Sequence, residues 1–240
     1  NDFGNGMPAA LGIWRTAHLD RKVKNVTISD KEANGVTIQV EYELSAIAVP
    51  YTLEYLIQND GSIRVTASMD MTGRDLPELV RFGMRTELPA QYDNLTYYGR
   101  GPWENYNDRN ESAFIGLYSD SVGNQYCNGY IRPQESGYKT DVRWLTLADS
   151  KGRGVRVQGI QPICFSAINH SDESLDPGLT KKQQHPSNLP PDNNVYLHID
   201  LKQRGLGGDN SWGALPHDQY RLLDKKYTFS YVISLIDSDE

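Results

Sequence analysis

The residues best suited to chemistry in this sequence are carboxylic acids in two segments rich in aromatic and polar side chains. The first segment, Tyr97–Arg109, contains Glu104 and Asp108. Sugar hydrolysis requires two carboxyl groups flanking a scissile bond, about 5–5.5 Å apart in retaining enzymes and about 6.5–9.5 Å apart in inverting ones. An arginine lies close to each acid in the sequence, Arg100 or Arg109, so structural ion pairing is the simpler interpretation.

The second acidic segment, Tyr130–Trp144, contains Glu135, Asp141 and Arg143. These groups are suited either to a site or to a buried hydrogen-bonded network. Side chains two positions apart in a strand point to the same face, so an ion pair between Asp141 and Arg143 is expected. The structural interpretation is favoured here too, and no catalytic residue is predicted in the chain.

Signatures of metal and cofactor binding are missing from the sequence. None of the five histidines belongs to a His-x-x-x-His pair or has acidic neighbours at metal spacing, so no zinc site is predicted. Asp192, Asn193 and Asn194 carry oxygen atoms of the kind that calcium accepts, but they do not make a full ligand set. Nucleotide-binding motifs are also missing, and no cofactor is predicted in this domain. The histidines are His18, His170, His185, His198 and His217.

The segment most suggestive of ligand binding is Gly205–Gly213, which follows an expected strand. Its glycines permit a sharp loop with exposed backbone. Asp209, Asn210 and Ser211 supply hydrogen-bonding groups beside the large ring of Trp212. An indole face suits the CH face of a pyranose, so Trp212 is a candidate sugar platform, and burial of the ring in the core is the alternative.

The charge and the hydropathy pattern exclude two classes of partner. The 240 residues include 24 Lys and Arg against 31 Asp and Glu, which gives a formal net charge of −7. There is no basic stripe to neutralise phosphates and no run of about 18 apolar residues to span a membrane. We therefore expect neither nucleic acid nor membrane as a partner. The two cysteines, Cys127 and Cys164, lack metal-site spacing.

The elements that must position these residues are predicted to be strands. Apolar and polar residues alternate over 36–43, 51–55, 63–69, 195–201 and 227–236, as in strands with one buried face. Asp60 and Gly61 predict a hairpin turn. Helical periodicity is scarce, and the proline-rich stretch 171–194 is expected to be a long surface excursion with one short helical turn. The pattern predicts one all-β, antiparallel domain over residues 1–240, a large sandwich.

Taken together, these segments resemble the C-terminal domain of large bacterial β-galactosidases of the LacZ type, in glycoside hydrolase family 2. The resemblance covers nearly the whole chain, and its motifs follow in family order. The motifs are Asn1-Asp2-Phe3-Gly4 with Trp14 and Ala17, Arg81–Arg85, Tyr98–Arg109, Pro133–Gly137 with Thr140–Trp144, Phe165–Ala167, His185 and Gly207–Trp212.

The resemblance implies a fold, and it implies that the catalytic groups lie in a different domain. The fold is a large two-sheet supersandwich shared with galactose mutarotase. The catalytic glutamates and the catalytic magnesium of the family belong to a TIM barrel elsewhere in the polypeptide, so Glu104 and Glu135 are not assigned as a catalytic pair. One loop of this domain reaches the active site in that family. The matching ring is Trp212, with residues 209–211 shaping the loop.

The resemblance also implies partners: a galactoside substrate, the catalytic barrel of the same polypeptide and further copies in a homo-oligomer. A sequence that begins at Asn1, without Met or a signal-like segment, fits a piece of a longer polypeptide. The isolated chain is then expected to lack hydrolase activity. Two alternatives stay open: an autonomous mutarotase-like domain, and a non-catalytic carbohydrate-binding or interface module.

Overall fold

The computed structural model describes residues 6–29, 34–176, 178, 184–210 and 212–237 of the chain. Strands account for most of the regular structure in this part of the chain, and their pairing is antiparallel. The prediction of an all-β, antiparallel fold is confirmed. The strands are β1 (Arg21–Ile28), β2 (Gly35–Leu44), β3 (Val49–Gln58), β4 (Ile63–Asp70), β5 (Arg81–Pro89), β6 (Asn94–Gly101), β7 (Phe114–Ser121), β8 (Lys139–Ala148), β9 (Gly154–Ile168), β10 (Asn194–Gln203) and β11 (Lys226–Ile236).

The helices are short, as the scarcity of helical periodicity predicted. Within the stretch 171–194, the described residues include two single turns, α3 and η2, where the sequence predicted one. No helix in the described part of the chain is long and apolar enough to cross a membrane. The α-helices are α1 (Met7–Leu11), α2 (Ile13–Thr16) and α3 (Asp172–Leu175), and the 3-10 helices are η1 (Val122–Gln125), η2 (Pro186–Asn188) and η3 (Asp218–Tyr220).

The chain divides into two compact units. Unit 1 comprises residues 1–83 and 201–234, and unit 2 comprises residues 84–200 and 235–240. Unit 1 therefore contains β1 to β4, nearly all of β11 and the segment between β10 and β11 that carries Trp212. Unit 2 contains β6 to β9 and most of β5 and β10. The expectation of a single domain over residues 1–240 stays a prediction.

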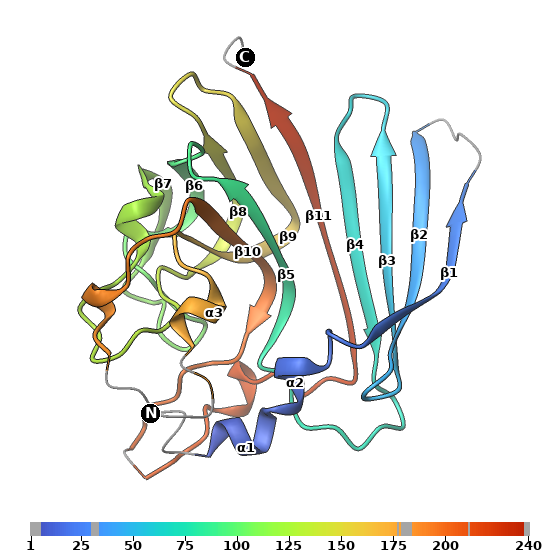
Figure 1. Ribbon diagram of the computed structural model, residues 1–240, viewed down its shortest axis with the longest axis horizontal. Coiled ribbons are helices and arrows are strands. Elements are labelled where there is room, and N and C mark those ends of the chain that lie inside the picture. Colours follow the sequence, from blue (N-terminus) through green and yellow to red (C-terminus); the bar gives the residue numbers. More distant parts are fainter. Residues whose placement is uncertain (1–5, 30–33, 177, 179–183, 211, 238–240) are drawn as a thin grey trace. The chain divides into compact units, whose positions relative to one another are not determined.

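The sheet of unit 1 has one apolar and one polar face. Its strands follow the order β1-β2-β3-β4-β11 (Figure 1). The register places Leu53 beside Ala67 and Ala67 beside Phe229, so a buried apolar row crosses three strands. On the other face, Oγ1 of Thr66 lies 2.9 Å from Oγ of Ser230. Because side chains alternate along a strand, this two-faced sheet follows directly from the alternating sequence pattern.

The hairpin between β3 and β4 turns at the predicted residues. Gly61 has a φ of 84°, which favours glycine. The Oδ1 atom of Asp60 accepts hydrogen bonds from the backbone N–H of Ser62 at 2.9 Å and from its hydroxyl at 2.7 Å. These bonds lower the pKa of Asp60. A local turn signal thus sets the register of two central strands of unit 1.

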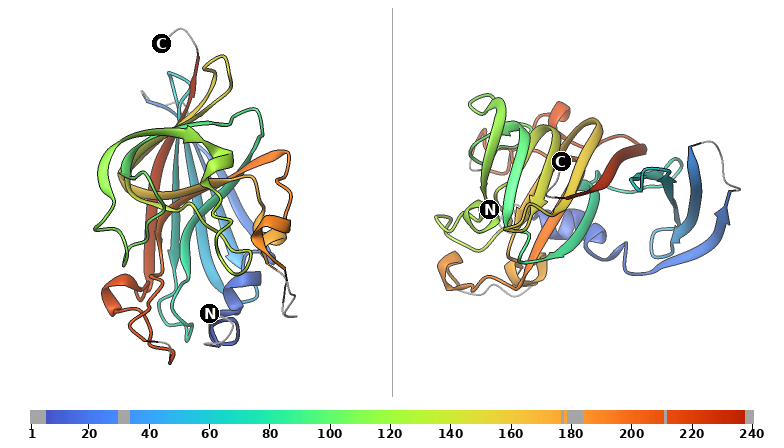
Figure 2. Two further views of the ribbon diagram at one scale, coloured as in Figure 1. Left: turned by 90° about the vertical axis from the view of Figure 1, so that its left-hand side faces the viewer. Right: turned by 90° about the horizontal axis from the view of Figure 1, so that it is seen from above.

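In unit 2 the strands follow the order β7-β6-β8-β9-β10, and β5 pairs with β10. The green to gold ribbons in Figure 2 show β6 to β9 side by side. The register aligns Tyr97 with Leu145 and Leu145 with Val157, and all three side chains are buried. The ring of Tyr97 also meets the ring of Phe165 edge to face, with centroids 5.3 Å apart. This core supports the segments that carry the sequence-predicted acids.

Candidate functional site

The loop that was predicted to bind ligand lies in unit 1, between β10 and η3. Its two ends are joined by a hydrogen bond of 2.8 Å from the backbone N–H of Gly205 to the carbonyl of Tyr220. Gly207, Gly208 and Gly213 have φ values of 72°, 118° and 90°, which other residues rarely adopt. The glycines in this motif are therefore required by the backbone path of the loop, which we call the Trp212 loop, residues 205–220.

Trp212 is 94% exposed, so the ring does not pack into the core. Its backbone N–H donates to Oδ1 of Asn210 at 2.8 Å, and the N–H of Ala214 donates to the same oxygen at 3.3 Å. Asn210 therefore shapes the turn that presents the ring, which is a common use of an asparagine side chain. Ser211, which was expected to help shape the loop, lies outside the described residues.

Asp209 takes part in an interaction that the sequence did not indicate. Its Oδ2 atom lies 2.6 Å from Nε2 of His217, and both side chains are exposed. The two residues lie on opposite sides of Trp212 in the sequence, so this contact fastens one flank of the turn to the other. No periodicity or spacing rule links positions eight apart in an irregular loop, which is why sequence reasoning missed His217 as a partner.

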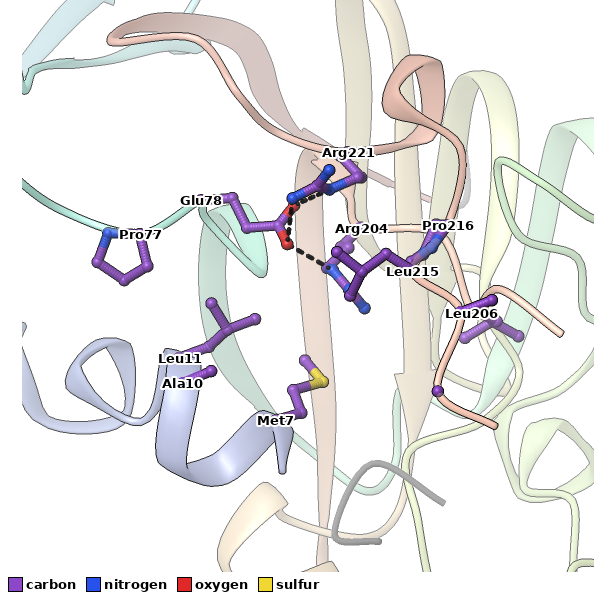
Figure 3. Close-up of a pocket in the computed structure, with 12 residues that line it drawn as sticks. Met7, Ala10, Leu11, Pro77, Glu78, Arg204, Leu206, Leu215, Pro216 and Arg221 are labelled. Atoms are coloured by element: carbon purple, nitrogen blue, oxygen red, sulfur yellow. Dashed lines mark hydrogen bonds and ion pairs between the residues drawn. The ribbon is translucent and has the colours of Figure 1, made fainter. Parts of the chain in front are cut away.

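A cavity of about 350 Å³ borders the Trp212 loop in unit 1. Figure 3 shows apolar residues of α1 on one side and the apolar part of the loop on the other, with three charged residues between them. Glu78 is the one carboxylate among the described lining residues, so the cavity lacks the acid pair that glycoside hydrolysis needs. The lining residues are Met7, Ala10, Leu11, Pro77, Glu78, Arg204, Leu206, Gly213, Ala214, Leu215, Pro216 and Arg221.

The charged wall of the cavity is an ion-pair cluster of Glu78, Arg204 and Arg221. Oε1 of Glu78 accepts from Nε of Arg204 at 3.2 Å, and Oε2 accepts from Nε of Arg221 at 2.8 Å. The second guanidinium also donates from Nη2 to Oε1 at 3.2 Å. These residues were missed at the sequence level because they lie in separate stretches of the chain and belong to no shared motif.

In unit 2, Glu104 is held in a hydrogen-bonded network. Its carboxylate accepts from Nη2 of Arg109 at 3.1 Å, from the backbone N–H of Gly137 at 3.0 Å, and from the hydroxyl of Tyr130. The sequence predicted ion pairing of Glu104 and Asp108 with Arg100 and Arg109 without fixing the pairs, and the structure pairs Glu104 with Arg109. Burial and the nearby Glu104 carboxylate raise the pKa of Tyr106. The geometry fits a structural network that joins the two acidic segments.

Asp141 and Arg143 do not form the expected side-chain ion pair, and that prediction is wrong. The register of β8 shifts between Lys139 and Val142, and Asp141 has a φ of 53°, so the regular alternation of side chains is interrupted there. The carboxylate of Asp141 instead pairs with Nε of Arg100 at 2.5 Å. Arg143 donates to the backbone carbonyl of Asp141.

Arg100 and Glu135 have structural partners in unit 2. Arg100 was expected to form an ion pair with an acid of its own segment, Tyr97–Arg109. Besides Asp141, it bonds through Nη1 to the carbonyl of Asn110 at 3.2 Å and to that of Ala113 at 3.0 Å. Oε1 of Glu135 accepts from the hydroxyl of Ser166 at 2.8 Å. These contacts hold the side chains within the protein and do not form the pair of facing carboxyl groups that glycoside hydrolysis requires.

A buried lysine was not anticipated from the sequence. Lys139 is 1% exposed, and its Nζ donates to Oε1 of Gln125 and to the carbonyl of Gly137, both at 2.9 Å. Burial lowers the pKa of Lys139 to about 8, although Glu104 acts in the opposite direction. Lysine is almost never fully buried, so its residue type gave no signal of this position.

The structure does not bring the histidines together as a metal site. His198 is buried, and its Nε2 lies 3.2 Å from Oδ1 of Asp172. The buried His170 stacks on Tyr126 with ring centroids 4.0 Å apart. Among the residues that the structure describes, no three His, Cys, Asp or Glu side chains are grouped so that they could hold a metal ion.

Comparison with known proteins gives consistent matches over nearly the full chain. A family model described as beta galactosidase small chain matches residues 1–233. A beta-galactosidase from Priestia megaterium is 36% identical over 234 residues, which cover 97% of this chain and 22% of that protein. Beta-galactosidase BgaC from Bifidobacterium adolescentis is 34% identical over 231 residues, covering 92% of this chain and 21% of that protein. The chain therefore spans about a fifth of the length of these relatives.

Among solved structures, a galactose mutarotase related enzyme from Lactobacillus acidophilus matches with a TM-score of 0.41 and 10% identity, over 90% of this chain and 73% of that one. A GH36 alpha-galactosidase, AgaA from Geobacillus stearothermophilus, matches with a TM-score of 0.45 and 10% identity, over 91% of this chain and 28% of that one.

Proposed function

Because this chain belongs to the β-galactosidase small-chain family, we propose that it serves as the C-terminal domain of an enzyme that hydrolyses terminal β-D-galactosides. In this proposal the domain supplies the Trp212 loop to a galactoside pocket whose catalytic groups lie in a barrel of the same polypeptide. The domain also supports the assembly of the polypeptide into a homo-oligomer. The observation that carries the proposal is the exposed ring of Trp212, which lies on a turn held by the side chain of Asn210.

The proposal is supported by the apolar ring and the polar groups of the loop, which match the two kinds of surface on a sugar. An exposed indole presents a flat apolar face to the CH groups of a pyranose while polar groups around it meet the hydroxyls. Asn210 uses its side-chain oxygen to fix the turn, and Asp209 engages His217, so both act first on the loop itself. We therefore assign the stacking contact to Trp212 and the shaping of the loop to Asp209 and Asn210.

The catalytic step is assigned to groups outside this chain. A retaining mechanism needs a nucleophilic carboxylate and an acid/base carboxyl at close range. Glu104 and Glu135 have structural partners, and Glu78 is neutralised by two arginines. Catalytic magnesium is likewise assigned to the barrel, where it would supply positive charge to the site. The residues of this chain bind and orient the galactoside and exclude water from one side of it.

The test is Trp212→Ala in the β-galactosidase polypeptide that carries this chain, with Trp103→Ala as the matched control. Trp103 is also an exposed tryptophan, but it lies in unit 2. Loss of a stacking ring is expected to lower kcat/KM for a chromogenic galactoside by about 10- to 100-fold, mainly through KM. Trp103→Ala should change kcat/KM less than twofold. Unchanged kinetics in Trp212→Ala would show that the loop has no role in substrate binding.

A second measurement separates this proposal from an autonomous enzyme. The isolated 240-residue chain is expected to hydrolyse no chromogenic galactoside above the uncatalysed rate, and to leave the mutarotation of fresh α-galactose unchanged in polarimetry. Hydrolysis by the purified chain would contradict the assignment of the catalytic groups to a barrel. Accelerated mutarotation would favour a sugar-active domain in its own right.

A further inference from the structure

Glu78 lies at the base of the Trp212 loop and contacts the residues at both of its ends. Arg204 immediately precedes the loop and Arg221 immediately follows it. The two carboxylate oxygens of Glu78 accept hydrogen bonds from both guanidinium groups, at 2.8 to 3.2 Å (Figure 3). One side chain therefore joins the two points at which the loop leaves and rejoins the body of unit 1.

The backbone around Glu78 is itself fixed to both flanks of the loop. The N–H of Arg204 donates to the carbonyl of Val80 at 2.9 Å, and the N–H of Leu79 donates to the carbonyl of Leu222 at 3.2 Å. The indole N–H of Trp14 donates to the carbonyl of Glu78 at 2.8 Å. Hydrogen bonds therefore hold the backbone around Glu78 on both sides. A side chain on a well-held backbone can position the side chains that it contacts.

Burial makes the ion-pair cluster sensitive to removal of the carboxylate. The side chains of Glu78, Arg204 and Arg221 are 6%, 10% and 20% exposed. Without the shared carboxylate, the buried guanidinium of Arg204 would lose its ion pair, and Arg221 would keep only the exposed Asp218, 2.8 Å from its Nη1. Loss of one partner of a buried ion pair is strongly unfavourable. The hydrogen bonds to Glu78 raise the pKa of Arg221, consistent with a stabilised charged form.

The contacts of Asn210 and of Asp209 with His217 hold the turn around Trp212 together, whereas the position of the whole loop on unit 1 depends on its two ends. Three of its glycines adopt positive φ, and glycine loses the most conformational freedom when it is ordered. The backbone hydrogen bond from Gly205 to Tyr220 crosses the base of the loop at one point, about which the loop can tilt. A carboxylate that holds Arg204 and Arg221 together restricts this tilt.

We propose that Glu78 is a positioning residue that fixes both ends of the Trp212 loop and thereby sets where the indole ring stands. The effect on loop order follows from the geometry of unit 1 alone. Only the last step, that a correctly placed ring improves galactoside binding, rests on the proposed function. The residue acts through Arg204 and Arg221 and touches no substrate.

Loop order is tested first, by backbone hydrogen exchange of the chain with and without Glu78→Gln. Glutamine has nearly the same shape but no charge and one acceptor oxygen fewer, so the hydrogen-bonded amides of the loop and its end should exchange about tenfold faster. These are the amides of Gly205, Trp212, Ala214, Tyr220 and Arg221. The matched control is Asp149→Asn, which removes another buried carboxylate paired with an arginine, in unit 2. That control should speed exchange in its own turn, residues 149–154, and leave the Trp212 loop unchanged. Equal exchange of the loop in Glu78→Gln and the parent chain would overturn the proposal.

A second variant keeps the test informative if Glu78→Gln does not fold. Arg204→Gln removes the pair at the first end of the loop and retains the pair of Glu78 with Arg221. Exchange should then rise more at Gly205 than at Arg221 and Leu222, by about threefold or more. A uniform change along the loop, or none, would contradict the idea that each arginine fixes its own end.

Kinetics of the β-galactosidase polypeptide separate failure of this inference from failure of the proposed function. In Glu78→Gln, KM for a galactoside should rise about three- to tenfold with kcat changed less than twofold, and Glu78→Asp should recover part of the loss because it retains the charge. If the loop loosens but both Glu78→Gln and Trp212→Ala leave KM unchanged, Glu78 positions the loop and the substrate role of the ring is wrong. If Trp212→Ala raises KM and Glu78→Gln does not, the ring binds substrate and Glu78 does not position it.

Discussion

At the scale of single residues, the chemistry of this chain depends on burial and partners more than on residue type. Glu104 and Asp141 stand in motifs that suggested acid chemistry, and both have arginine partners. Lys139 belongs to no sequence motif with a predicted role, yet it is fully buried with two hydrogen-bond acceptors for its ammonium group. Since desolvation disfavours a charged group, this lysine is the residue whose titration should most clearly affect stability.

We expect Lys139 to make the chain more stable as the pH rises from about 8 to about 10.5. In this window the unfolded chain binds a proton that the folded chain has released, because the folded pKa of Lys139 is about 8 against an ordinary value of 10.5. Below the window both states are protonated, and above it both are neutral. The gain relative to Lys139→Met should reach about 3 kcal/mol, measured by urea unfolding at pH 7 and pH 10.5.

The control for this pH effect is Lys151→Met, which removes an exposed lysine from the turn before β9. Other groups also titrate in alkaline solution, and burial raises the pKa of Tyr51 to about 12, so only the difference between parent and variant isolates one lysine. Lys151→Met should follow the parent chain at both pH values. A difference between parent and Lys139→Met that does not change with pH would show that Lys139 is protonated alike in the folded and unfolded states.

At the scale of elements, strand pairing and close backbone contacts decide where side chains point. The β8–β9 hairpin illustrates this. Asp149 closes its turn by accepting from the N–H groups of Lys151 at 2.8 Å and Arg153 at 3.0 Å. Gly154 then begins β9 so close to β8 that an added Cβ would lie 1.9 Å from the carbonyl oxygen of Leu147. The same sheet tolerates a bulge at Asp141, which redirects its carboxylate to Arg100.

Gly154→Ala should therefore destabilise the chain by about 1–3 kcal/mol, because strands β8 and β9 must separate to accept the methyl group. Gly123→Ala is the control: its added Cβ would have no heavy atom closer than 3.8 Å, and neither glycine has a positive φ. Thermal unfolding of the two variants gives the comparison. A melting temperature of Gly154→Ala equal to that of Gly123→Ala would show that the hairpin relaxes without cost.

At the scale of the whole molecule, the chain contains two compact units but matches one family model over residues 1–233. Unit 1 carries the Trp212 loop and its ion-pair cluster, whereas unit 2 carries the acidic segments and Lys139. The chain spans 22% and 21% of the length of two beta-galactosidase relatives, and we propose galactosidase activity only for a polypeptide that contains this chain. The single-domain prediction requires that the two units fold and unfold together.

We expect the chain to unfold in one cooperative transition. Trp14 lies in unit 1 and Trp144 in unit 2, so two variants in which one of these is the single tryptophan, with the other three tryptophans replaced by phenylalanine, report on the units separately. Their fluorescence should give the same midpoint in urea, as a two-state transition requires. Two midpoints separated by more than the error of the fits would contradict the single-domain prediction.

Alternation, turn chemistry and ordered motifs are local properties of the chain, so the sequence predicts the all-β class, the family, the hairpin at Asp60 and Gly61, and strands β2, β3, β4, β10 and β11, although not the bounds of the other strands. It also placed Trp212 on a loop. Tertiary structure alone decided that the ring is exposed and that Asp141 pairs with Arg100. It also decided which residues hold the loop: Glu78 lies 126 and 143 positions from its two arginines, and no local pattern encodes contacts across such separations. Such pairs form only when the packing of unit 1 brings distant segments to the same buried place.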